Sequence, residues 1–174
     1  MRFVETPLAG AYVIEFEARG DDRGFFGRAF CREELRAQGL NDHIEQMNLS
    51  GSAAAGTFRG FHYQLPPHGE VKIIRCVNGA TYNVIVDMRP DSPTYLQSFG
   101  TELSVENHTA LYIPEMFANG ILSLTDGAES MYSVSQGYAP DAERGVRVDD
   151  PKLGIELPIP ITVLSDKDQA WPLL

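Results

Sequence analysis

The chain has 174 residues and a formal net charge of −10, with 24 acidic residues against 14 basic ones. This length fits one domain, spanning residues 1–174, whose core is large enough to need no disulfide bonds. The acidic balance argues against binding to nucleic acid or to an anionic membrane surface. No apolar run approaches the length of a membrane span, and the two cysteines lie far apart in apolar surroundings. We therefore expect a cytoplasmic protein with free thiols.

Short runs of alternating apolar residues fill most of the chain, and turn signals such as Asn78-Gly79 and Asp126-Gly127 separate them. Such spacing predicts an all-β protein, an antiparallel β-sandwich or jelly roll. One helix is expected at residues 31–38, ending at Gly39, and a second short one at residues 139–144. In chain order, the expected strands are residues 11–16, 59–64, 71–77, 81–88, 96–104, 110–114, 120–124 and 129–135.

Three basic residues in two of these extended runs are the first candidates for a functional site. Arg59 and His62 belong to Arg59-Gly60-Phe61-His62-Tyr63-Gln64, and Lys72 begins the next run. Side chains share a strand face at a spacing of two residues, whereas Arg59 and His62 are three apart. They can face one cavity only if the strand bends or bulges between them, for which Gly60 is suited. A cavity that holds an imidazole beside fixed cations suits an anionic substrate that must lose a proton.

A series of short motifs resembles the dTDP-4-dehydrorhamnose 3,5-epimerase family of deoxysugar biosynthesis over nearly the whole chain. The resemblance implies a cupin-type jelly roll with a few short peripheral helices, no metal and no organic cofactor. It also implies a homodimer in which the N-terminal segment of one subunit crosses to the other. In order, the motifs are Arg23-Gly24-Phe25-Phe26, Gln46-Met47-Asn48-Leu49-Ser50, the hexapeptide at residues 59–64, Val86-Asp87-Met88-Arg89, Ser92-Pro93-Thr94, residues 103–107, Ile113-Pro114-Glu115, Phe117-Ala118-Asn119-Gly120 and residues 164–168.

The family's reaction removes a hydrogen next to the carbonyl of a nucleotide-linked 4-keto-6-deoxy sugar and returns it on the opposite face. His62 matches the base, and the resemblance pairs it with Asp150, although the neighbouring Asp149 competes for that role. A carboxylate on the far ring nitrogen fixes the tautomer of such a histidine. Lys72 matches the group that stabilises the enolate oxygen, and Tyr132 matches the acid that returns the proton.

The same resemblance assigns residues to substrate binding. Arg59 is expected to hold the diphosphate, with Arg23 reaching across the dimer. Tyr138 is a candidate for stacking on the nucleotide base. Asp87 and Arg89 are expected to form a structural pair at the end of a strand. The remaining residues expected to line the nucleotide and sugar pocket are Phe26, Gln46, Asn48 and Asn119.

The sequence also departs from the family pattern. Asn119 stands where a histidine is usual, Arg28 where an acidic residue is common, Met47 for an aspartate, Glu70 for a glutamine and Val148 for a tryptophan. We expect proton abstraction to be kept. The sequence leaves open which nucleotide and sugar are bound, and whether carbon 3, carbon 5 or both are inverted.

Two other classes of protein also fit the sequence. One is a metal-dependent cupin that would use His62, Gln64, His68 and Glu70, although a facial metal site needs two histidines and a carboxylate that converge. The other is a cupin that binds a sugar nucleotide without catalysis, for which the altered Asn119 and Arg28 are the motive.

Overall fold

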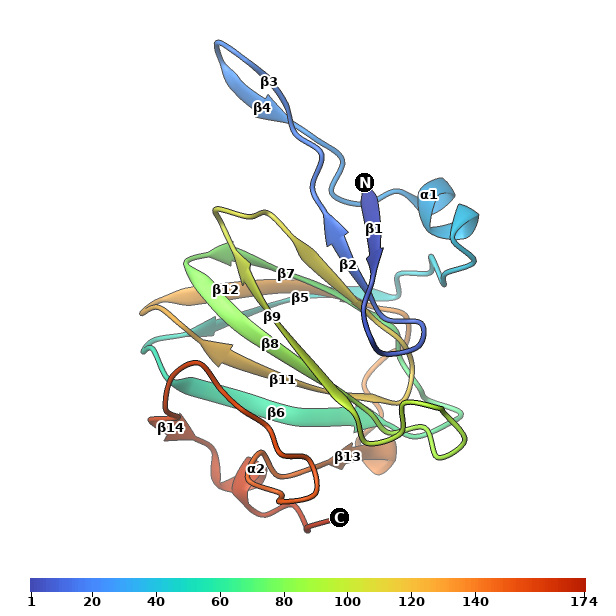
Figure 1. Cartoon of the computed structure of the whole chain (residues 1–174), viewed down its shortest axis with the longest axis vertical. Helices are drawn as coiled ribbons and strands as arrows, with labels where there is room; N and C mark the ends of the chain where they lie inside the picture. The colour runs from blue at the N-terminus through green and yellow to red at the C-terminus, as the bar shows by residue number, and fades with distance from the viewer.

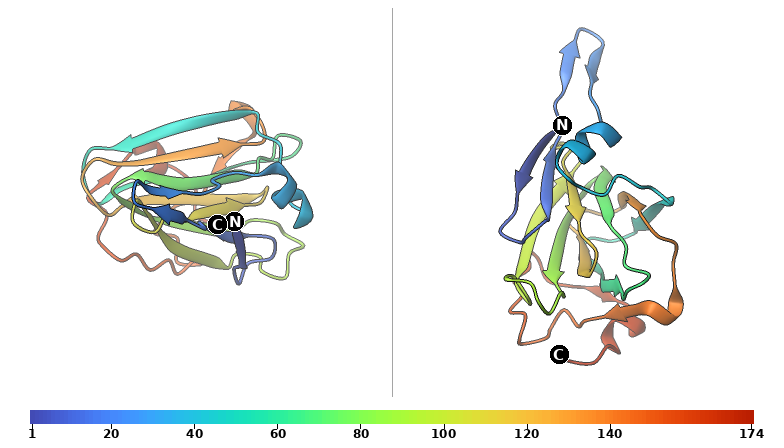
Figure 2. Two further views of the ribbon diagram at one scale, coloured as in Figure 1. Left: turned by 90° about the horizontal axis from the view of Figure 1, so that it is seen from above. Right: turned by 90° about the vertical axis from the view of Figure 1, so that its right-hand side faces the viewer.

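The computed structural model describes all residues from 1 to 174 and consists of two stacked antiparallel sheets (Figures 1 and 2). This two-layer arrangement confirms the predicted jelly-roll class. The first sheet contains, in spatial order, β1 (Arg2–Glu5), β2 (Tyr12–Glu15), β10 (Ala110–Ile113), β7 (Lys72–Asn78), β12 (Ala128–Val134) and β5 (Gln46–Ser52). The second contains β13 (Glu143–Gly145), β6 (Thr57–Gln64), β11 (Phe117–Ser123), β8 (Ala80–Asp87) and β9 (Ser98–Ser104), with the short β14 (Val163–Leu164) parallel to β6.

A separate hairpin, β3 (Arg19–Asp21) with β4 (Gly24–Phe26), stands away from the two sheets near the N-terminus (Figures 1 and 2). The C-terminus lies at the opposite end of the molecule. Two short α-helices complete the fold, α1 (Arg32–Ala37) and α2 (Asp166–Gln169), and neither is long enough to cross a lipid bilayer.

Every strand predicted from alternation is present, with boundaries shifted by at most a few residues. The predicted helix at residues 31–38 is also present as α1, and Gly39 behind it takes a positive φ of 71°. The second predicted helix is wrong in most of its length. Pro140 starts only a 3₁₀ turn to Ala142, after which Glu143 becomes extended and pairs with Gln64 on β6. Pairing with an open sheet edge outweighs the weak local preference for helix.

The interior between the two sheets is apolar and comes from inward-facing residues of both layers. Its buried members are Leu8, Ala11, Ile74, Cys76, Ile85, Leu103, Leu111, Ile113 and Phe117. The other face of the second sheet is also covered, because the chain after β13 folds back over it. That layer contains Phe58, Phe61, Val84, Val86, Met88, Ala118, Leu122, Val146 and Leu153. The C-terminal part of the chain is therefore held against β6, which is the strand that carries His62.

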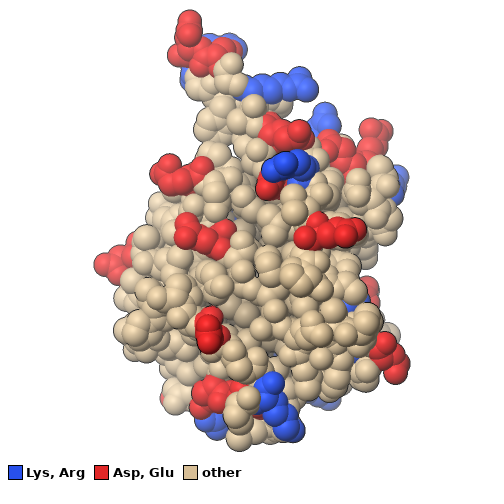
Figure 3. Space-filling model, viewed as in Figure 1, with Lys and Arg blue, Asp and Glu red and all other residues tan.

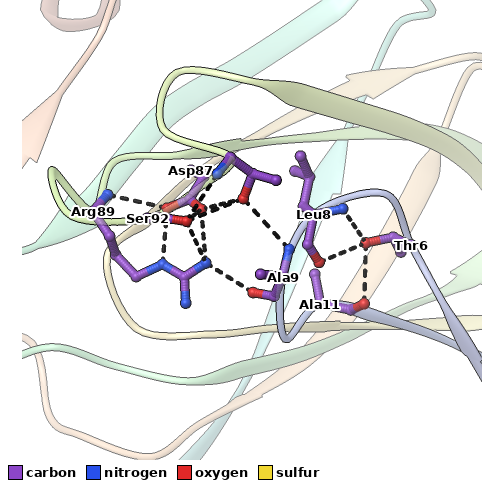
Figure 4. Close-up of polar contacts among 8 residues, drawn as sticks. Thr6, Leu8, Ala9, Ala11, Asp87, Arg89 and Ser92 are labelled. Carbon is purple, nitrogen blue, oxygen red and sulfur yellow. Dashed lines mark hydrogen bonds and ion pairs between the residues drawn. The ribbon is translucent and has the colours of Figure 1, made fainter.

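The predicted pair of Asp87 and Arg89 is confirmed at the end of β8 (Figure 4). The guanidinium donates to both carboxylate oxygens, at 2.8 and 2.7 Å, and to the backbone oxygen of Ala9 at 2.8 Å. The hydroxyls of Ser92 and Thr94 also donate to Asp87, whose side chain is fully buried. These contacts tie the loop after β8 to the turn between β1 and β2.

Charged side chains of both signs are interspersed on the face drawn in Figure 3. They gather on the hairpin end and at the opposite end, while the middle of this face carries few of them.

Candidate active site

A bulge in β6 brings Arg59 and His62 to the same side of the strand. In the pairing with β11, Arg59 lies opposite Ile121 and His62 opposite Asn119, so three steps on β6 match two on β11. Gly60 provides the extra residue, with a φ of +132°, and a Cβ there would lie 2.5 Å from the backbone oxygen of Asn119. Only glycine fits this position. The bend that the sequence required between Arg59 and His62 is therefore confirmed.

The bulge opens into a cavity of about 440 Å³ between the two sheets. Arg59, His62 and Asn119 enter it from the second sheet, and Lys72 and Tyr132 enter it from the first. Tyr132 pairs with Ile74 and Val134 with Lys72 across β7 and β12, so Tyr132 and Lys72 are diagonal neighbours on the inner face. Five predicted site residues thus share one cavity, with the imidazole and the phenol on opposing walls.

The carboxylate partner of His62 is Asp168, and the expected pairing with Asp150 is wrong. The Nε2 atom of His62 lies 2.6 Å from Oδ1 of Asp168, whose side chain is only 5% exposed. Asp150 is buried elsewhere, where it accepts hydrogen bonds from the backbone N–H groups of Lys152 and Leu174, at 2.9 and 2.7 Å. Asp149, the competing candidate, pairs with Arg147 on the surface.

Asp168 reaches the imidazole because α2 docks against β6. Ser165 caps this helix by accepting a hydrogen bond from the backbone N–H of Asp168. In a Ser-x-x-Asp sequence the acidic side chain usually turns back to the first residue of the motif. Here it points at β6 instead and also accepts from the backbone N–H of Gly60, at 3.3 Å. The capping pattern in residues 165–168 could have revealed the helix, but not its docking site.

The pairing fixes the direction of proton transfer at His62. An ionised carboxylate only accepts hydrogen bonds, so the imidazole carries its proton on Nε2. The other nitrogen, Nδ1, then has a free lone pair and makes no hydrogen bond within the protein. His62 can therefore act as a base through Nδ1.

Of the three Lys and Arg side chains that line the two cavities, two are paired with carboxylates and one is not. Lys72 is paired with Glu70 at 2.9 Å, and Lys167 with Glu143 at 2.7 Å. Arg59 has no carboxylate partner and donates instead to the backbone oxygen of Gly51 at 2.9 Å and to the hydroxyl of Ser52 at 3.4 Å. Arg59 is thus the cation whose charge remains uncompensated, and an anionic group is attracted to it.

Tyr132 is held in its protonated form. Burial raises the pKa of its phenol above the ordinary value, the negative charge of Glu70 raises it further, and the positive charge of Arg59 partly opposes this. A phenol that stays protonated can donate a proton to a reaction intermediate at neutral pH.

A second cavity of about 300 Å³ adjoins the first, and His62, Lys72 and Tyr132 line both. The predicted binding residues Gln46, Asn48 and Tyr138 line this second cavity. The amide of Gln46 donates to that of Asn48 at 3.1 Å, and the exposed Tyr138 donates its hydroxyl to Glu143 at 2.9 Å. The imidazole, the ammonium and the phenol thus line both cavities.

Arg23 and Phe26 lie outside both cavities of this chain. They belong to the β3–β4 hairpin, where the Arg23 side chain is 89% exposed and pairs with Asp21, and Phe26 is 77% exposed. Within one subunit neither residue approaches His62.

Two of the departures from the family pattern line the cavities. Asn119 is buried and donates weakly to the backbone oxygens of Val84 and Gly120, at 3.3 and 3.4 Å. Glu70 pairs with Lys72. Met47 faces solvent from β5, and Arg28 pairs with Glu34 near the hairpin. Asn119 and Glu70 therefore line the cavities, whereas Met47 and Arg28 lie outside both within one subunit.

The residues of the metal-cupin alternative do not form a metal site. Gln64 donates to the backbone oxygens of His68 and Gly137, and Glu70 is engaged by Lys72. No three His, Cys, Asp or Glu side chains gather in a geometry that could hold a metal ion.

A jelly roll that holds a His–Asp pair opposite a partly buried phenol, with an ammonium beside the phenol, has the groups that acid–base chemistry on a carbon acid requires. The chain belongs to the dTDP-4-dehydrorhamnose 3,5-epimerase family, whose model matches residues 5–174.

Individual relatives agree with this assignment. The dTDP-4-dehydrorhamnose 3,5-epimerase of Shigella flexneri is 39% identical over 169 residues, covering 97% of this chain and 93% of that protein. The crystal structure of the Bacillus anthracis enzyme of the same name, with TDP and PPi bound, has a TM-score of 0.95 at 41% identity, covering 99% of each chain. A dTDP-4-dehydrorhamnose 3-epimerase of Streptomyces niveus is 36% identical over 175 residues, covering 100% of this chain and 84% of that protein. Enzymes described as 3,5-epimerase and as 3-epimerase are thus similarly close to this chain.

Proposed function

We propose that the protein epimerises a nucleotide-linked 4-keto-6-deoxy sugar at carbon 3, carbon 5 or both, as a dTDP-4-dehydrorhamnose 3,5-epimerase does. The observation that carries the proposal is the meeting of His62 and Tyr132 on opposing walls of one cavity, with Lys72 beside the phenol. Inversion of a carbon needs a base on one face and an acid on the other. An arrangement with both groups on one wall would return the proton to the face that it left.

In the proposed reaction, Nδ1 of His62 takes the proton from the carbon next to the ketone, while Asp168 stabilises the resulting imidazolium. The electron pair of the broken C–H bond forms a C=C bond to the carbonyl carbon, and the carbonyl oxygen becomes an enolate oxygen. The ammonium of Lys72 donates a hydrogen bond to this oxygen. Loss of such a donor costs about 10²–10³ in kcat. Tyr132 then donates its proton to the same carbon from the opposite face, and the carbonyl re-forms. Water afterwards takes the proton from His62 and returns one to the Tyr132 phenolate, which restores both groups.

The nucleotide is proposed to lie along the two cavities. Arg59, the cation without a carboxylate partner, suits the diphosphate, since a guanidinium binds phosphate oxygens in pairs. Gln46, Asn48 and Tyr138 then line the remainder of the site, with Tyr138 free to stack on a base. Asn119 contacts the sugar end and offers a neutral amide there. The names of the relatives favour a thymidine nucleotide.

Deuterium exchange tests this reaction directly. Incubation with dTDP-4-keto-6-deoxyglucose in D₂O should place deuterium at each carbon that the enzyme deprotonates, as read by NMR and mass spectrometry. Exchange at carbon 3 alone would identify a 3-epimerase. His62→Ala should abolish exchange, whereas His43→Ala, which changes an exposed histidine outside both cavities, should not. Nucleotide-sugar binding without any exchange in the unaltered protein would refute the proposal and indicate a binding protein.

We also propose that the protein acts as a homodimer in which the β3–β4 hairpin of each subunit reaches the site of the other. The hairpin stands away from the body (Figure 1), and its Arg23 and Phe26 side chains are 89% and 77% exposed. Met47 and Leu49 add exposed apolar area on β5, at 58% and 65%. Placed at a partner's cavity, Arg23 and Phe26 could contact the nucleotide.

Mixing two impaired variants tests the crossed hairpin. If the hairpin serves the partner's site, a heterodimer of Arg23→Ala and His62→Ala subunits contains one fully intact site and has about half of the activity of a wild-type dimer. If each hairpin served its own subunit, mixing would restore nothing. A monomeric mass in light scattering at assay concentrations would also refute the dimer.

We place the reaction in the cytoplasm, in keeping with the two free thiols, Cys31 and Cys76.

A further inference from the structure

The ion pair between Glu70 and Lys72 lies inside the site rather than on the surface. The two side chains are each only 13% exposed, and their charged atoms are 2.9 Å apart. Glu70 lines the second cavity together with His62, Lys72 and Tyr132. By contrast, the Arg147–Asp149 pair has side chains that are 36% and 63% exposed, where solvent screens the attraction. Because solvent does not screen this ion pair, it restricts the positions that the Lys72 ammonium can take.

Lys72 has a flexible four-carbon stem, and the site offers it several competing anions. Asp168 lies across the first cavity, and a bound diphosphate would add further negative charge near Arg59. An ammonium drawn to either of them would leave the position beside Tyr132. Glu70, two residues before Lys72 in the chain, holds the ammonium on the wall that also carries the phenol.

We propose that Glu70 is a positioning residue that anchors the Lys72 ammonium beside Tyr132 and balances its charge there. This inference rests on the proposed function, because it assigns Glu70 a part in placing the enolate-stabilising lysine and the proton donor of that reaction. Glu70 itself touches neither the diphosphate cation Arg59 nor the His62–Asp168 pair.

The charged and titratable groups around Tyr132 come from several elements of the fold. They line the two cavities with it and are Glu70 just before β7, Lys72 at the start of β7, Arg59, His62 and Tyr63 on β6, Tyr138 in the loop after β12, Glu143 on β13, and Lys167 and Asp168 on α2. Burial is the largest influence on the pKa of Tyr132 and raises it, Glu70 is the next and also raises it, and Arg59 lowers it. Replacement of Glu70 by a neutral residue therefore lowers the pKa of Tyr132.

Glu70→Gln removes the charge and keeps the size of the side chain, and it tests the inference in two ways. First, an NMR pH titration of the ligand-free protein labelled with ¹³C at the tyrosine ring carbons follows Tyr132, whose signal is assigned from Tyr132→Phe. We expect the Tyr132 titration to move to lower pH in Glu70→Gln. Second, we expect kcat for inversion to fall by about tenfold, because the lysine is no longer anchored, while KM changes by less than about twofold.

Two further variants serve as controls. Glu70→Asp restores the charge and should return the Tyr132 titration toward that of the unaltered protein. Glu129→Gln removes a charge from β12, the strand of Tyr132, but at a residue that lines neither cavity, and it should change nothing. An unchanged Tyr132 titration and an unchanged kcat in folded Glu70→Gln would overturn the inference. Absence of exchange in the unaltered protein would instead refute the proposed function, and the titration would still measure the coupling of Glu70 to Tyr132.

Discussion

Asp168→Asn replaces one oxygen of the His62 partner with an NH₂ group and leaves the shape of the side chain unchanged. The amide oxygen can accept from the backbone N–H of Gly60, and the NH₂ group then faces Nε2 of His62. A donor at this position requires Nε2 to be unprotonated, which places the proton on Nδ1. The nitrogen that we propose as the base, Nδ1, can then no longer accept a proton.

The size of the effect follows from the contact. A hydrogen bond between an imidazolium and a nearly buried carboxylate contributes about 1.5–3 kcal/mol, which is roughly 10–150-fold in rate when it is made in the transition state. The wrong tautomer adds to this loss, and in a comparable His–Asp pair the total was about 10⁴ in kcat. We expect kcat of Asp168→Asn to fall by about 10³–10⁴, with substrate affinity nearly unchanged.

Asp150→Asn is the matched control, because both aspartates are buried and both are candidates for the same role. Asp150 accepts from the backbone N–H groups of Lys152 and Leu174, and an amide can satisfy only one of them. The free energy of unfolding should fall by about 1–3 kcal/mol, a loss of several degrees in Tm, while kcat stays within about threefold.

The assay is deuterium incorporation in D₂O, measured under single-turnover conditions beside a thermal melt of each variant. Exchange at the normal rate in Asp168→Asn, or loss of exchange in a folded Asp150→Asn, would refute the assignment of Asp168 as the partner of His62.

Two further predictions concern Tyr132 and Asp87. Tyr132→Phe should retain deuterium exchange within about tenfold while inversion falls by about 10²–10⁴, because His62 can still remove and return the proton on its own face; equal loss of both would contradict the role of Tyr132 as acid. Burial alone would raise the pKa of Asp87, but hydrogen bonds from Arg89, Ser92 and Thr94 outweigh it and lower the pKa from 3.8 to about 2. This depressed pKa contributes stability that is fully present above about pH 4 and is lost as pH falls toward 2, roughly 2 kcal/mol in total. In urea unfolding, Asp87→Asn should remove this part of the pH dependence. Arg147 also lowers the pKa of Asp149, but that side chain is 63% exposed and screened by solvent, so Asp149→Asn should change the pH dependence much less. A full acid-dependent slope in Asp87→Asn would contradict the assignment.

The features that can be predicted from the sequence are those set by neighbouring residues. Alternation fixes which side chains of a strand share a face, so Lys72 lies on the same face as Ile74 and Cys76, and the structure turns that face inward. A three-residue spacing between Arg59 and His62 requires a bulge, and Gly60 is the residue that permits one. The Asp87–Arg89 pair is similarly local, since its members are two positions apart.

Short or weakly patterned elements escape prediction of this kind. The strand β1, the β3–β4 hairpin and the small β13 and β14 are too short to alternate clearly, and β5 alternates with its apolar Met47 and Leu49 exposed. They form because a sheet edge or a neighbouring hairpin strand offers hydrogen bonds, which the local sequence does not display.

The sequence by itself determined the class of fold, the family and three groups that line both cavities, the side chains of His62, Lys72 and Tyr132. All of these follow from local patterns and ordered motifs. Only the tertiary structure decided which carboxylate serves the imidazole. Asp150 and Asp168 both lie in the C-terminal part of the chain, and neither motif states where it will pack. Asp168 lies 106 positions from His62 and reaches it because the apolar chain after β13 covers the second sheet and docks α2 against β6. Contacts of this kind depend on the packing of whole layers, and no short stretch of sequence encodes them.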